Sequence, residues 1–254
     1  MNHLTVATKI GEPDHSLPDG SFADQYNQLR TNEGRLYGDE VVKLLPFISR
    51  NHPHYKEWLI RKRSCNQLLK YIRTKNSSAN ILEIGCGNGW LTAKIANITS
   101  GQVLGLDINA TQIKQARRVF GTASDCRFIE GNIDDGVLGD QKFDFIIFAA
   151  SIQYFWNLED ILNTTLSHLT LQGEIHIIDS RFYRFMEIAK SQQKSKAYFD
   201  SMGCPAMAGY YYHHQIDNLA FFQRQFLFDP NSLWHKMIYR YHPFHWIVIK
   251  NGYQ

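Results

Sequence analysis

The chain has 254 residues, a mass of 29.5 kDa, 44% hydrophobic residues and 20% charged residues, which fits one globular α/β domain with additions. Its formal net charge of +3 is too small an excess to require a nucleic-acid partner, although it permits one. The four cysteines are widely spaced and form no C-x-x-C pair, which argues against a zinc site or a disulfide framework and favours a reducing compartment.

The N-terminal part begins with residues 1–24, which are polar and rich in glycine and proline and predict a loosely held arm. It lacks a basic segment followed by a long apolar core, and no apolar run approaches the ~20 residues of a membrane span, so we expect a soluble, cytoplasmic protein with no membrane partner. Two helices are predicted next. A short one over residues 40–45 is capped by Asp39 and stopped by Pro46, and a long one covers residues 55–74.

The first half of the long helix carries four basic residues, Lys56, Arg61, Lys62 and Arg63. A surface for single-stranded nucleic acid would have several aromatic residues between such charges, and the one that stands among them, Trp58, belongs to the apolar stripe of the helix. We therefore interpret the basic run as a solvated helix face opposite an apolar stripe, which argues against a nucleic-acid partner.

The sequence NILEIGCGNGW, residues 80–90, predicts a buried strand that ends in a tight glycine turn and leads into a helix. Gly85, Gly87 and Gly89 allow the backbone to approach a ligand closely, and the start of the following helix offers unpaired N–H groups. A dinucleotide fingerprint, G-x-G-x-x-G, would need its third glycine where Trp90 stands. The turn therefore predicts a ligand site, but not one for a dinucleotide.

The pattern is instead E-x-G-x-G-x-G with Glu83 near the end of the strand, and it resembles the first motif of the class I S-adenosylmethionine-dependent methyltransferases. The resemblance extends over residues 78–180. It implies an α/β, three-layer Rossmann-like methyltransferase fold: a mostly parallel sheet with an antiparallel C-terminal strand, N-terminal helices, and an insertion after the fifth strand. It also implies S-adenosyl-L-methionine as the cofactor and S-adenosyl-L-homocysteine as the product.

The rest of the chain alternates strands and helices, as a mostly parallel sheet requires. The predicted strands cover residues 102–106, 127–129, 143–148 and 174–178, and the predicted helices cover residues 110–120, 157–169 and 183–201. Two closing strands are expected at residues 233–239 and 245–249. We predict one domain with a helical extension (1–75), a cofactor-binding core (76–181), an insertion or lid (182–230) and a C-terminal strand pair (231–254).

The resemblance also implies roles for single residues. Asp107, which closes the second strand, would accept hydrogen bonds from both ribose hydroxyls, a task that suits an ionised carboxylate. Asn132 stands where the family usually has Asp and would accept a hydrogen bond from the adenine amino group. The implied cofactor-binding residues are Glu83, Gly85, Cys86, Gly87, Gly89, Asp107, Ile108, Asn132, Ile133, Ala149 and Ser151.

The end of the fourth strand marks the expected acceptor side. Enzymes of this family that methylate the amino groups of bases usually carry Asn or Asp followed by two prolines there, and this chain has Ser151-Ile-Gln153 instead. The difference argues against methylation of DNA or RNA bases. Ser151, Gln153 and Tyr154 would still border the methyl group because of their position after the strand.

The run YYYHH, residues 210–214, is the other candidate for the acceptor side. It either forms a lid in which Tyr211 lies over the substrate and His213 or His214 acts as a general base, or it packs the insertion onto the core. Adjacent side chains tend to diverge and no Glu or Cys at ligand spacing accompanies the histidines, so we expect no metal. The candidate catalytic residues are Ser151, Tyr211, His213 and His214.

We expect this protein to transfer a methyl group to a small molecule. Two alternatives stay open: a methyltransferase that acts on RNA or protein, and a protein of the same fold that binds S-adenosylmethionine without catalysing transfer. The acceptor atom and the oligomeric state are left open as well.

Overall fold

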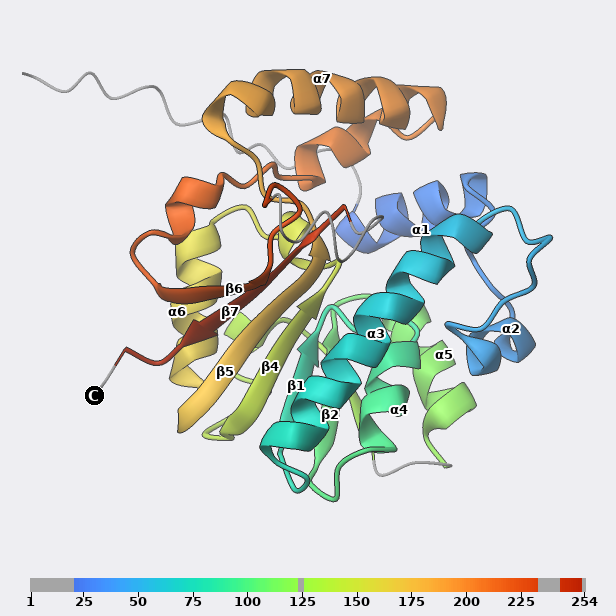
Figure 1. The fold of residues 1–254 in the computed structure, drawn as a ribbon. Coiled ribbons are helices and arrows are strands. Elements are labelled where there is room, and N and C mark those ends of the chain that lie inside the picture. Colours follow the sequence, from blue (N-terminus) through green and yellow to red (C-terminus); the bar gives the residue numbers. More distant parts are fainter. Residues whose placement is uncertain (1–20, 123–125, 233–242, 253–254) are drawn as a thin grey trace, which may run out of the picture.

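The computed structural model describes residues 21–122, 126–232 and 243–252, and a seven-stranded sheet forms its centre (Figure 1). The strands are β1 (Ile81–Ile84), β2 (Val103–Asp107), β3 (Cys126–Glu130), β4 (Phe143–Ala149), β5 (Leu169–Ser180), β6 (Gln223–Phe228) and β7 (His245–Lys250). Their order is β3-β2-β1-β4-β5-β7-β6. The first five strands run parallel, and β7 is antiparallel to both β5 and β6. The predicted mostly parallel sheet with an antiparallel C-terminal strand is confirmed.

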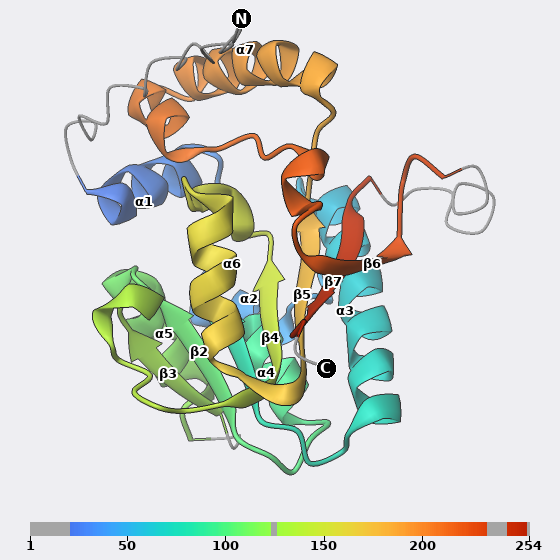
Figure 2. The same cartoon turned by 90° about the vertical axis from the view of Figure 1, so that its left-hand side faces the viewer.

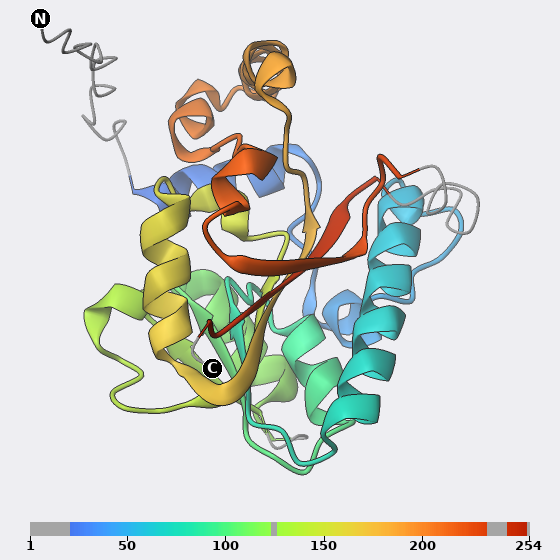
Figure 3. The ribbon, with the colours of Figure 1, turned by 60° about the vertical axis from the view of Figure 1, so that its left-hand side comes forward.

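Helices cover both faces of the sheet, so the molecule has three layers (Figure 3). The helices are α1 (Phe22–Asn32), α2 (Asp39–Leu44), α3 (Tyr55–Lys75), α4 (Trp90–Ala96), α5 (Ala110–Phe120), α6 (Leu158–Ser167) and α7 (Phe185–Ser201). One core cluster joins the sheet to α3, α4 and α5, with Leu68, Ile95 and Ile113 fully buried. The other joins it to α6, with Leu162 fully buried. Apolar stripes on these helices therefore close both faces of the sheet.

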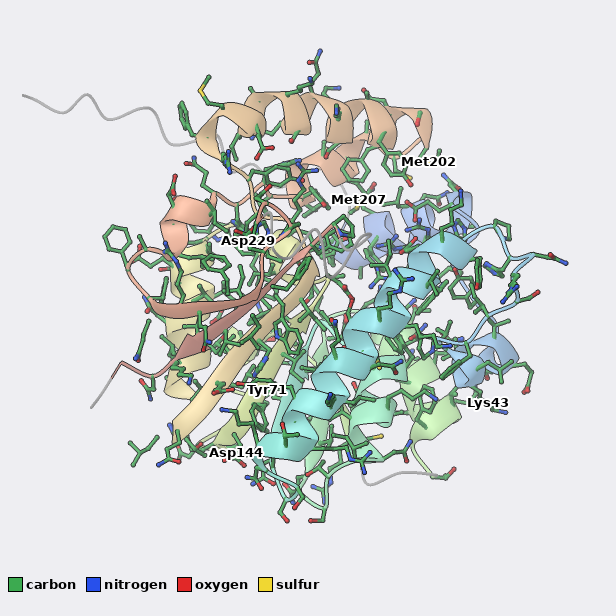
Figure 4. All side chains as sticks on the ribbon, viewed as in Figure 1. Lys43, Tyr71, Asp144, Met202, Met207 and Asp229 are labelled. Atoms are coloured by element: carbon green, nitrogen blue, oxygen red, sulfur yellow. The ribbon has the colours of Figure 1, made fainter. Side chains whose placement is uncertain are left out.

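The sheet also contains a buried polar cluster that ties α3 to β5. Tyr71 reaches from α3 and donates a hydrogen bond to Glu174 at 2.7 Å (Figure 4). Trp246 donates to Nδ1 of His176 at 3.0 Å, so Nε2 of His176 carries the hydrogen that faces Glu174, 3.2 Å away. Burial opposes ionisation of Glu174, but the hydrogen bonds from His176 and Tyr71 lower its pKa to about 2.

Helix α1 was not predicted, although α2 and α3 match the two predicted N-terminal helices. Only Leu29 of α1 is buried, and its apolar stripe has just three members, Phe22, Tyr26 and Leu29, among polar residues, so the helical signal in its sequence is weak. Its start is nevertheless marked by Ser21, whose hydroxyl accepts a hydrogen bond from the N–H of Asp24.

The C-terminal side of the sheet differs from the prediction as well. The partner of β7 is β6 (Gln223–Phe228), which lies in the stretch assigned from sequence to the insertion. β6 is an edge strand whose first half, Gln223-Arg224-Gln225, is entirely polar, and this weak apolar signal explains why it was missed. The strand predicted at residues 233–239 lies outside the described residues. β5 also begins earlier than the predicted residue 174, at Leu169, and it runs through Gly173 with a register shift against β4 between Leu169 and Glu174.

Above the carboxyl ends of the strands lies a cap made of α1, α7 and the short helix η3 (Pro205–Tyr210) (Figure 2). Leu29, Phe199 and Met207 share one apolar cluster, and Asn32 donates a hydrogen bond to the carbonyl of Met202 at 2.8 Å. Figure 4 shows Met202 and Met207 below α7, on the side of α1. None of the helices in the described part of the chain combines the length and apolar character that crossing a membrane needs.

Few buried residues hold the cap together. Phe199 is the one residue of α7 that is buried in the described structure. Replacing it by alanine should remove about 3–5 kcal/mol of packing. Because a helix of this length is marginal on its own, α7 should open locally. In hydrogen exchange, amides of α7 and η3 should exchange faster in Phe199→Ala while those of β4 keep their protection. Phe185→Ala is the matched control, because Phe185 is 71% exposed. An equal loss of protection in cap and sheet would contradict local opening.

Candidate functional site

A cleft with two lobes lies at the carboxyl ends of the parallel strands, where the strand order reverses between β1 and β4. The outer lobe has a volume of about 380 Å³ and extends along the ends of β2 and β3. The inner lobe, of about 120 Å³, lies between the glycine turn, α1 and α3. Tyr26, Gly85, Gly87 and Ala150 line both lobes. An elongated ligand would therefore cross the glycine turn from one lobe to the other.

The glycine turn forms the floor where the lobes meet. Gly85, Gly87 and Gly89 have φ values of 74°, 53° and 77°, in the region that favours glycine. A Cβ on Gly85 would lie 2.4 Å from the Cβ of Ser151, so no larger residue fits. The space over Gly87 is more open, since a Cβ there would meet only Oε1 of Gln112, at 3.7 Å.

The end of β4 is locked onto the end of β1 beside this floor. The hydroxyl of Ser151 donates a 2.6 Å hydrogen bond to the carbonyl of Ile84. Ala150 has a φ of 55°, rare for a residue with a side chain, and its N–H donates to the carbonyl of Ile178 at 3.0 Å. Strained backbone of this kind is typical of binding sites, because the surrounding contacts must hold it in place.

Asp107 stands at the end of β2 and organises the neighbouring turns. One carboxylate oxygen accepts the N–H of Gly87 at 2.7 Å, and the other accepts the N–H of Asn109 at 2.8 Å. Burial raises its pKa above the usual range, while these two hydrogen bonds act in the opposite direction. A carboxylate oxygen can accept more than one hydrogen bond, so Asp107 can hold the turn and still accept from a ligand in the outer lobe.

The far part of the outer lobe has apolar walls and one amide. Ile108 is 45% exposed, an unusual state for isoleucine, and Ile133 is buried. Asn132 also lines this lobe, and its N–H donates to Asp135 at 2.8 Å. The resemblance implied that these three residues bind the cofactor, and the structure brings them together in the lining of one lobe.

The inner lobe holds Glu83, Cys86 and Ala149 of the predicted set. Glu83 is buried, accepts a hydrogen bond from Thr92 at 2.5 Å, and has its pKa raised to about 8 because burial disfavours the charged form. Gly89 differs from the prediction, since it lines neither lobe. It precedes the first residue of α4, where a Cβ would lie 2.5 Å from the ring of Phe128, so it is a packing glycine.

The run 210–214 alternates between two sides, as an extended segment does. Tyr210 and Tyr212 line the outer lobe. Tyr211 faces away from it, toward Phe199 of α7, with ring centroids 5.7 Å apart. The segment is fixed at the cleft by the N–H of Tyr212, which donates to the carbonyl of Gln153 at 2.8 Å.

The two candidate bases have contacts away from the cleft. Nε2 of His213 lies 2.9 Å from the hydroxyl of Ser195 on α7. Nε2 of His214 lies 3.1 Å from the carbonyl of Ile152, to which it must donate because a carbonyl only accepts. Burial lowers the pKa of both histidines. Neither residue, nor Tyr211, lines either lobe, which favours the packing alternative over the lid that uses a histidine base.

Several residues of the cleft were missed from sequence. Tyr26 and Arg30 reach it from α1, and Trp58 and Arg61 reach it from α3, whereas Tyr154, which was expected on the acceptor side, lines the outer lobe. A signal existed in α1, because Tyr26 and Arg30 are four residues apart and share one helix face. Within the described residues, no group of three or more His, Cys, Asp or Glu side chains is arranged to hold a metal ion.

Comparisons with known proteins agree with this geometry. A family model described as a methyltransferase domain matches residues 75–239. A malonyl-[acyl-carrier protein] O-methyltransferase of Bacillus cereus is 25% identical over 144 residues, which cover 54% of this chain and 52% of that protein. The chain thus spans about half the length of the curated relatives it matches.

Two solved structures show the same fold. The YcgJ protein of Bacillus subtilis has a TM-score of 0.58 and 12% identity, over 76% of this chain and 100% of that one. Magnesium protoporphyrin IX methyltransferase from Synechocystis PCC 6803, solved with bound S-adenosylhomocysteine, has a TM-score of 0.56 and 12% identity, over 90% of this chain and 94% of that one. The family and fold predicted from the glycine motif are therefore confirmed.

The raised pKa of Glu83 predicts how stability depends on pH. The folded protein keeps a proton on this carboxyl up to a pH of about 8, whereas an ordinary carboxyl, with a pKa of 4.5, has lost it. The free energy of unfolding should therefore fall as pH rises between these values, by at most about 1.4 kcal/mol per pH unit. Glu83→Gln removes the titration and keeps an acceptor for Thr92. Its melting temperature should fall less than that of the wild type between pH 5 and pH 8, and parallel melting curves would contradict the assignment.

Proposed function

The chain belongs to the methyltransferase domain family, and on that premise we propose that it binds S-adenosylmethionine across the two lobes and transfers the methyl group to a small-molecule acceptor. The observation that carries the proposal is the pairing of Asp107 with the glycine turn. Their hydrogen bond places a half-buried carboxylate beside a floor of bare backbone that a ligand can approach closely.

The residues present fit such a cofactor. Asp107 offers acceptors to ribose hydroxyls, and the exposed Ile108 with the buried Ile133 offers apolar surface to a flat base. The open space over Gly87 suits the close passage of the methionine part. When bound, S-adenosylmethionine supplies a methyl group on a positively charged sulfur. The protein contributes position and a dry site, which can provide much of the rate of such a transfer.

The acceptor would lie beside Ser151, against the aromatic wall of the outer lobe. Ser151 acts in this proposal as a positioning residue, because its hydrogen is donated to Ile84 and fixes the end of β4. Tyr154, Tyr210 and Tyr212 offer flat surface with hydroxyl groups at its edge, the mixture that small-molecule sites use. They also exclude water from the reacting atoms. The histidines at 213 and 214 are assigned to packing.

A second candidate acceptor is an acyl group presented by a carrier protein. It is favoured by the name of the Bacillus cereus relative, a malonyl-[acyl-carrier protein] O-methyltransferase. A protein of the same name from Acetivibrio thermocellus is also similar to this chain, with 27% identity over 151 residues. The outer lobe would then receive the end of the acyl chain.

A methyltransferase for RNA would be favoured only if the basic face of α3 adjoined the opening of the cofactor site. Of the four basic residues in the first half of α3, Arg61 turns into the inner lobe and pairs there with Glu57 at 3.1 Å. Lys62 lies over the ring of Phe47, 4.3 Å from its centroid. These contacts favour a small-molecule acceptor over a nucleic acid.

Transfer of a labelled methyl group tests the proposal. The purified protein is incubated with S-adenosylmethionine labelled on the methyl group and with a metabolite extract, RNA, or an acyl-carrier protein loaded with a malonyl group. Label in a small product supports the first candidate, and label on the loaded carrier protein supports the second. Label in RNA, or tight cofactor binding with no transfer to any acceptor, would contradict the proposal.

Asp107 provides the sharpest test of cofactor binding. Asp107→Ala removes charge-assisted hydrogen bonds of about 1.5–3 kcal/mol each before water compensates. The dissociation constant of S-adenosylhomocysteine, measured by calorimetry, should rise at least tenfold. Asp140→Ala, at an exposed carboxyl outside both lobes, is the control. An unchanged constant in a folded Asp107→Ala protein would remove the basis of the assignment.

The neighbouring tyrosines 211 and 212 test the acceptor wall. Tyr212→Ala should reduce methyl transfer with little change in melting temperature, because Tyr212 lines the outer lobe. Tyr211→Ala should lower the melting temperature instead, because Tyr211 packs against Phe199 and Tyr154. Melting temperature, cofactor affinity and transfer are measured on one preparation of each variant. If both variants changed melting temperature, cofactor affinity and transfer in the same way, the assignment of Tyr212 to the acceptor wall and of Tyr211 to packing would be wrong.

A further inference from the structure

A wall of aromatic side chains lines the outer lobe. It is formed by residues of α1, of the turn after β4, and of η3 with the segment that follows it: Phe22, Tyr26, Tyr154, Tyr210 and Tyr212. The ring of Phe22 lies 5.2 Å from that of Tyr154 and 5.6 Å from that of Tyr210, measured between centroids. Tyr26 approaches Tyr154 in the same way, at 5.8 Å. Three separate parts of the chain therefore meet in one aromatic wall.

Packing inside the protein does not cover this wall completely. Tyr210 is buried, but Phe22, Tyr26, Tyr154 and Tyr212 are half-buried and line the lobe. The backbone of Tyr212 is fixed to the turn after β4 by a 2.8 Å hydrogen bond. Flat apolar surface that borders a cavity and is already held in place favours a flat ligand, because little further ordering is needed when the ligand binds.

The charged residues of the outer lobe are all acidic. Among the residues that the structure describes, no lysine, arginine or histidine lines it, whereas Asp107, Asp134 and Asp160 do. Asp107 is engaged with the glycine turn, and Asp134 and Asp160 are exposed. Exposed carboxylates attract cations and repel anions over about 8 Å at physiological ionic strength. A ligand with an acid group would lose water in this lobe without gaining a positively charged partner.

The basic residues of the cleft line the inner lobe: Arg30, Arg35 and Arg61. All three are paired within the protein. Arg30 pairs with Glu33 at 2.7 Å. Arg35 and Arg61 pair with Glu57, at 2.6 and 3.1 Å. Arg30 also reaches the aromatic wall, where Nη2 donates to the hydroxyl of Tyr154 at 3.4 Å. An acid group in the outer lobe would therefore have to compete with two glutamates and a tyrosine for these guanidinium groups.

We propose that the methyl acceptor is a flat aromatic molecule that is neutral or positively charged. The proposal rests on the proposed function, because the acceptor is the molecule that the proposed transfer methylates. It names the class of small molecule and separates it from the carrier-bound malonyl group. A malonyl group has no ring, and its free carboxylate would face aromatic rings and other carboxylates.

Transfer to such an acceptor needs no further reactant. A lone pair on the acceptor atom attacks the methyl carbon, the bond from that carbon to sulfur breaks, and its electron pair stays on sulfur. The positive charge thus moves from sulfur to the acceptor atom, which releases its proton to water. Faces of aromatic rings attract positive charge, so the wall also suits an acceptor atom that becomes positive during transfer.

The labelled product tests the proposal without a guess at the acceptor. The full chain is incubated with S-adenosylmethionine labelled on the methyl group and with a metabolite extract, and small products are passed over an anion exchanger at about pH 8, where carboxylates are ionised. We expect the label to pass through and to co-elute with near-ultraviolet absorbance. It should also survive mild alkali, which would release labelled methanol from a methyl ester.

A labelled product that is an acid, that lacks a ring or that loses methanol in alkali would overturn the proposal, as would label on a carrier protein loaded with a malonyl group. A chain that binds no S-adenosylhomocysteine, or that transfers label to no acceptor, would overturn the proposed function instead.

Matched probes test the effect of charge directly. Benzene, indole and naphthalene rings, each with an amine, an amide or a carboxylate on the same short chain, are titrated by calorimetry into the protein saturated with S-adenosylhomocysteine. In the ring series that binds, the carboxylate should bind at least tenfold more weakly than the amine and the amide. Equal or tighter binding of the carboxylate, or no binding in any of the three ring series, would overturn the proposal.

Two variants separate the contributions of charge and ring. Asp134→Asn combined with Asp160→Asn should weaken the amine about two- to fivefold at low salt and leave the amide unchanged, because only the amine is charged. Asp140→Asn, at an exposed carboxyl outside both lobes, is the control.

Tyr212→Leu should weaken the amine and the amide alike, and Tyr212→Phe should restore them. Phe221→Leu, at a ring that is 88% exposed and outside both lobes, is the control. Melting temperatures are measured on each variant to exclude unfolding. Full affinity for every ring compound in a folded Tyr212→Leu protein, or equal weakening of amine and amide by the aspartate changes, would overturn the proposal.

Discussion

The whole site depends on the close contact between the end of β1 and the end of β4. Gly85 has no room for a side chain because Ser151 occupies that space, and the hydroxyl of Ser151 is bonded to the carbonyl of Ile84. This contact fixes the glycine turn, and the turn in turn receives the hydrogen bond of Asp107 through Gly87. The floor of the cleft is thus set by backbone geometry, which many side-chain changes elsewhere would leave intact.

The cap over the cleft is held in place by side-chain contacts and not by backbone geometry. α1 is held over the cleft by apolar contacts with α7 and η3 and by the hydrogen bond from Asn32 to Met202. This cap carries Tyr26, Arg30 and Tyr210 into the walls of the lobes. Because its apolar cluster has far fewer buried residues than the two clusters of the sheet layers, the cap should open at a lower cost than the sheet. A rigid floor under a more weakly held cap would allow ligand entry without disturbing the sheet.

The sequence was informative where local pattern and structure coincide. The apolar run before Gly85, the glycine turn and Asp107 after β2 were predicted because strand, turn and helix follow one another within one segment. α1 and β6 were missed because each has few buried residues and gains its place from contacts with distant parts of the chain. The alternation of Tyr211 and Tyr212 was missed for a related reason. Residue type marks both as aromatic, but only the hydrogen bond from Tyr212 to Gln153 decides which ring faces the cleft.

The same contrast indicates where acceptor choice resides. The family match begins at residue 75, so it contains the floor but neither α1 nor most of α3. Yet Arg30 and Arg61, which set the charge of the inner lobe, come from those two helices. If members of the family share the floor and differ in the cap, they can bind the same cofactor and act on different acceptors. For this chain, the charge of the inner lobe and the tyrosines of the outer lobe should therefore predict the acceptor better than the identity of any relative.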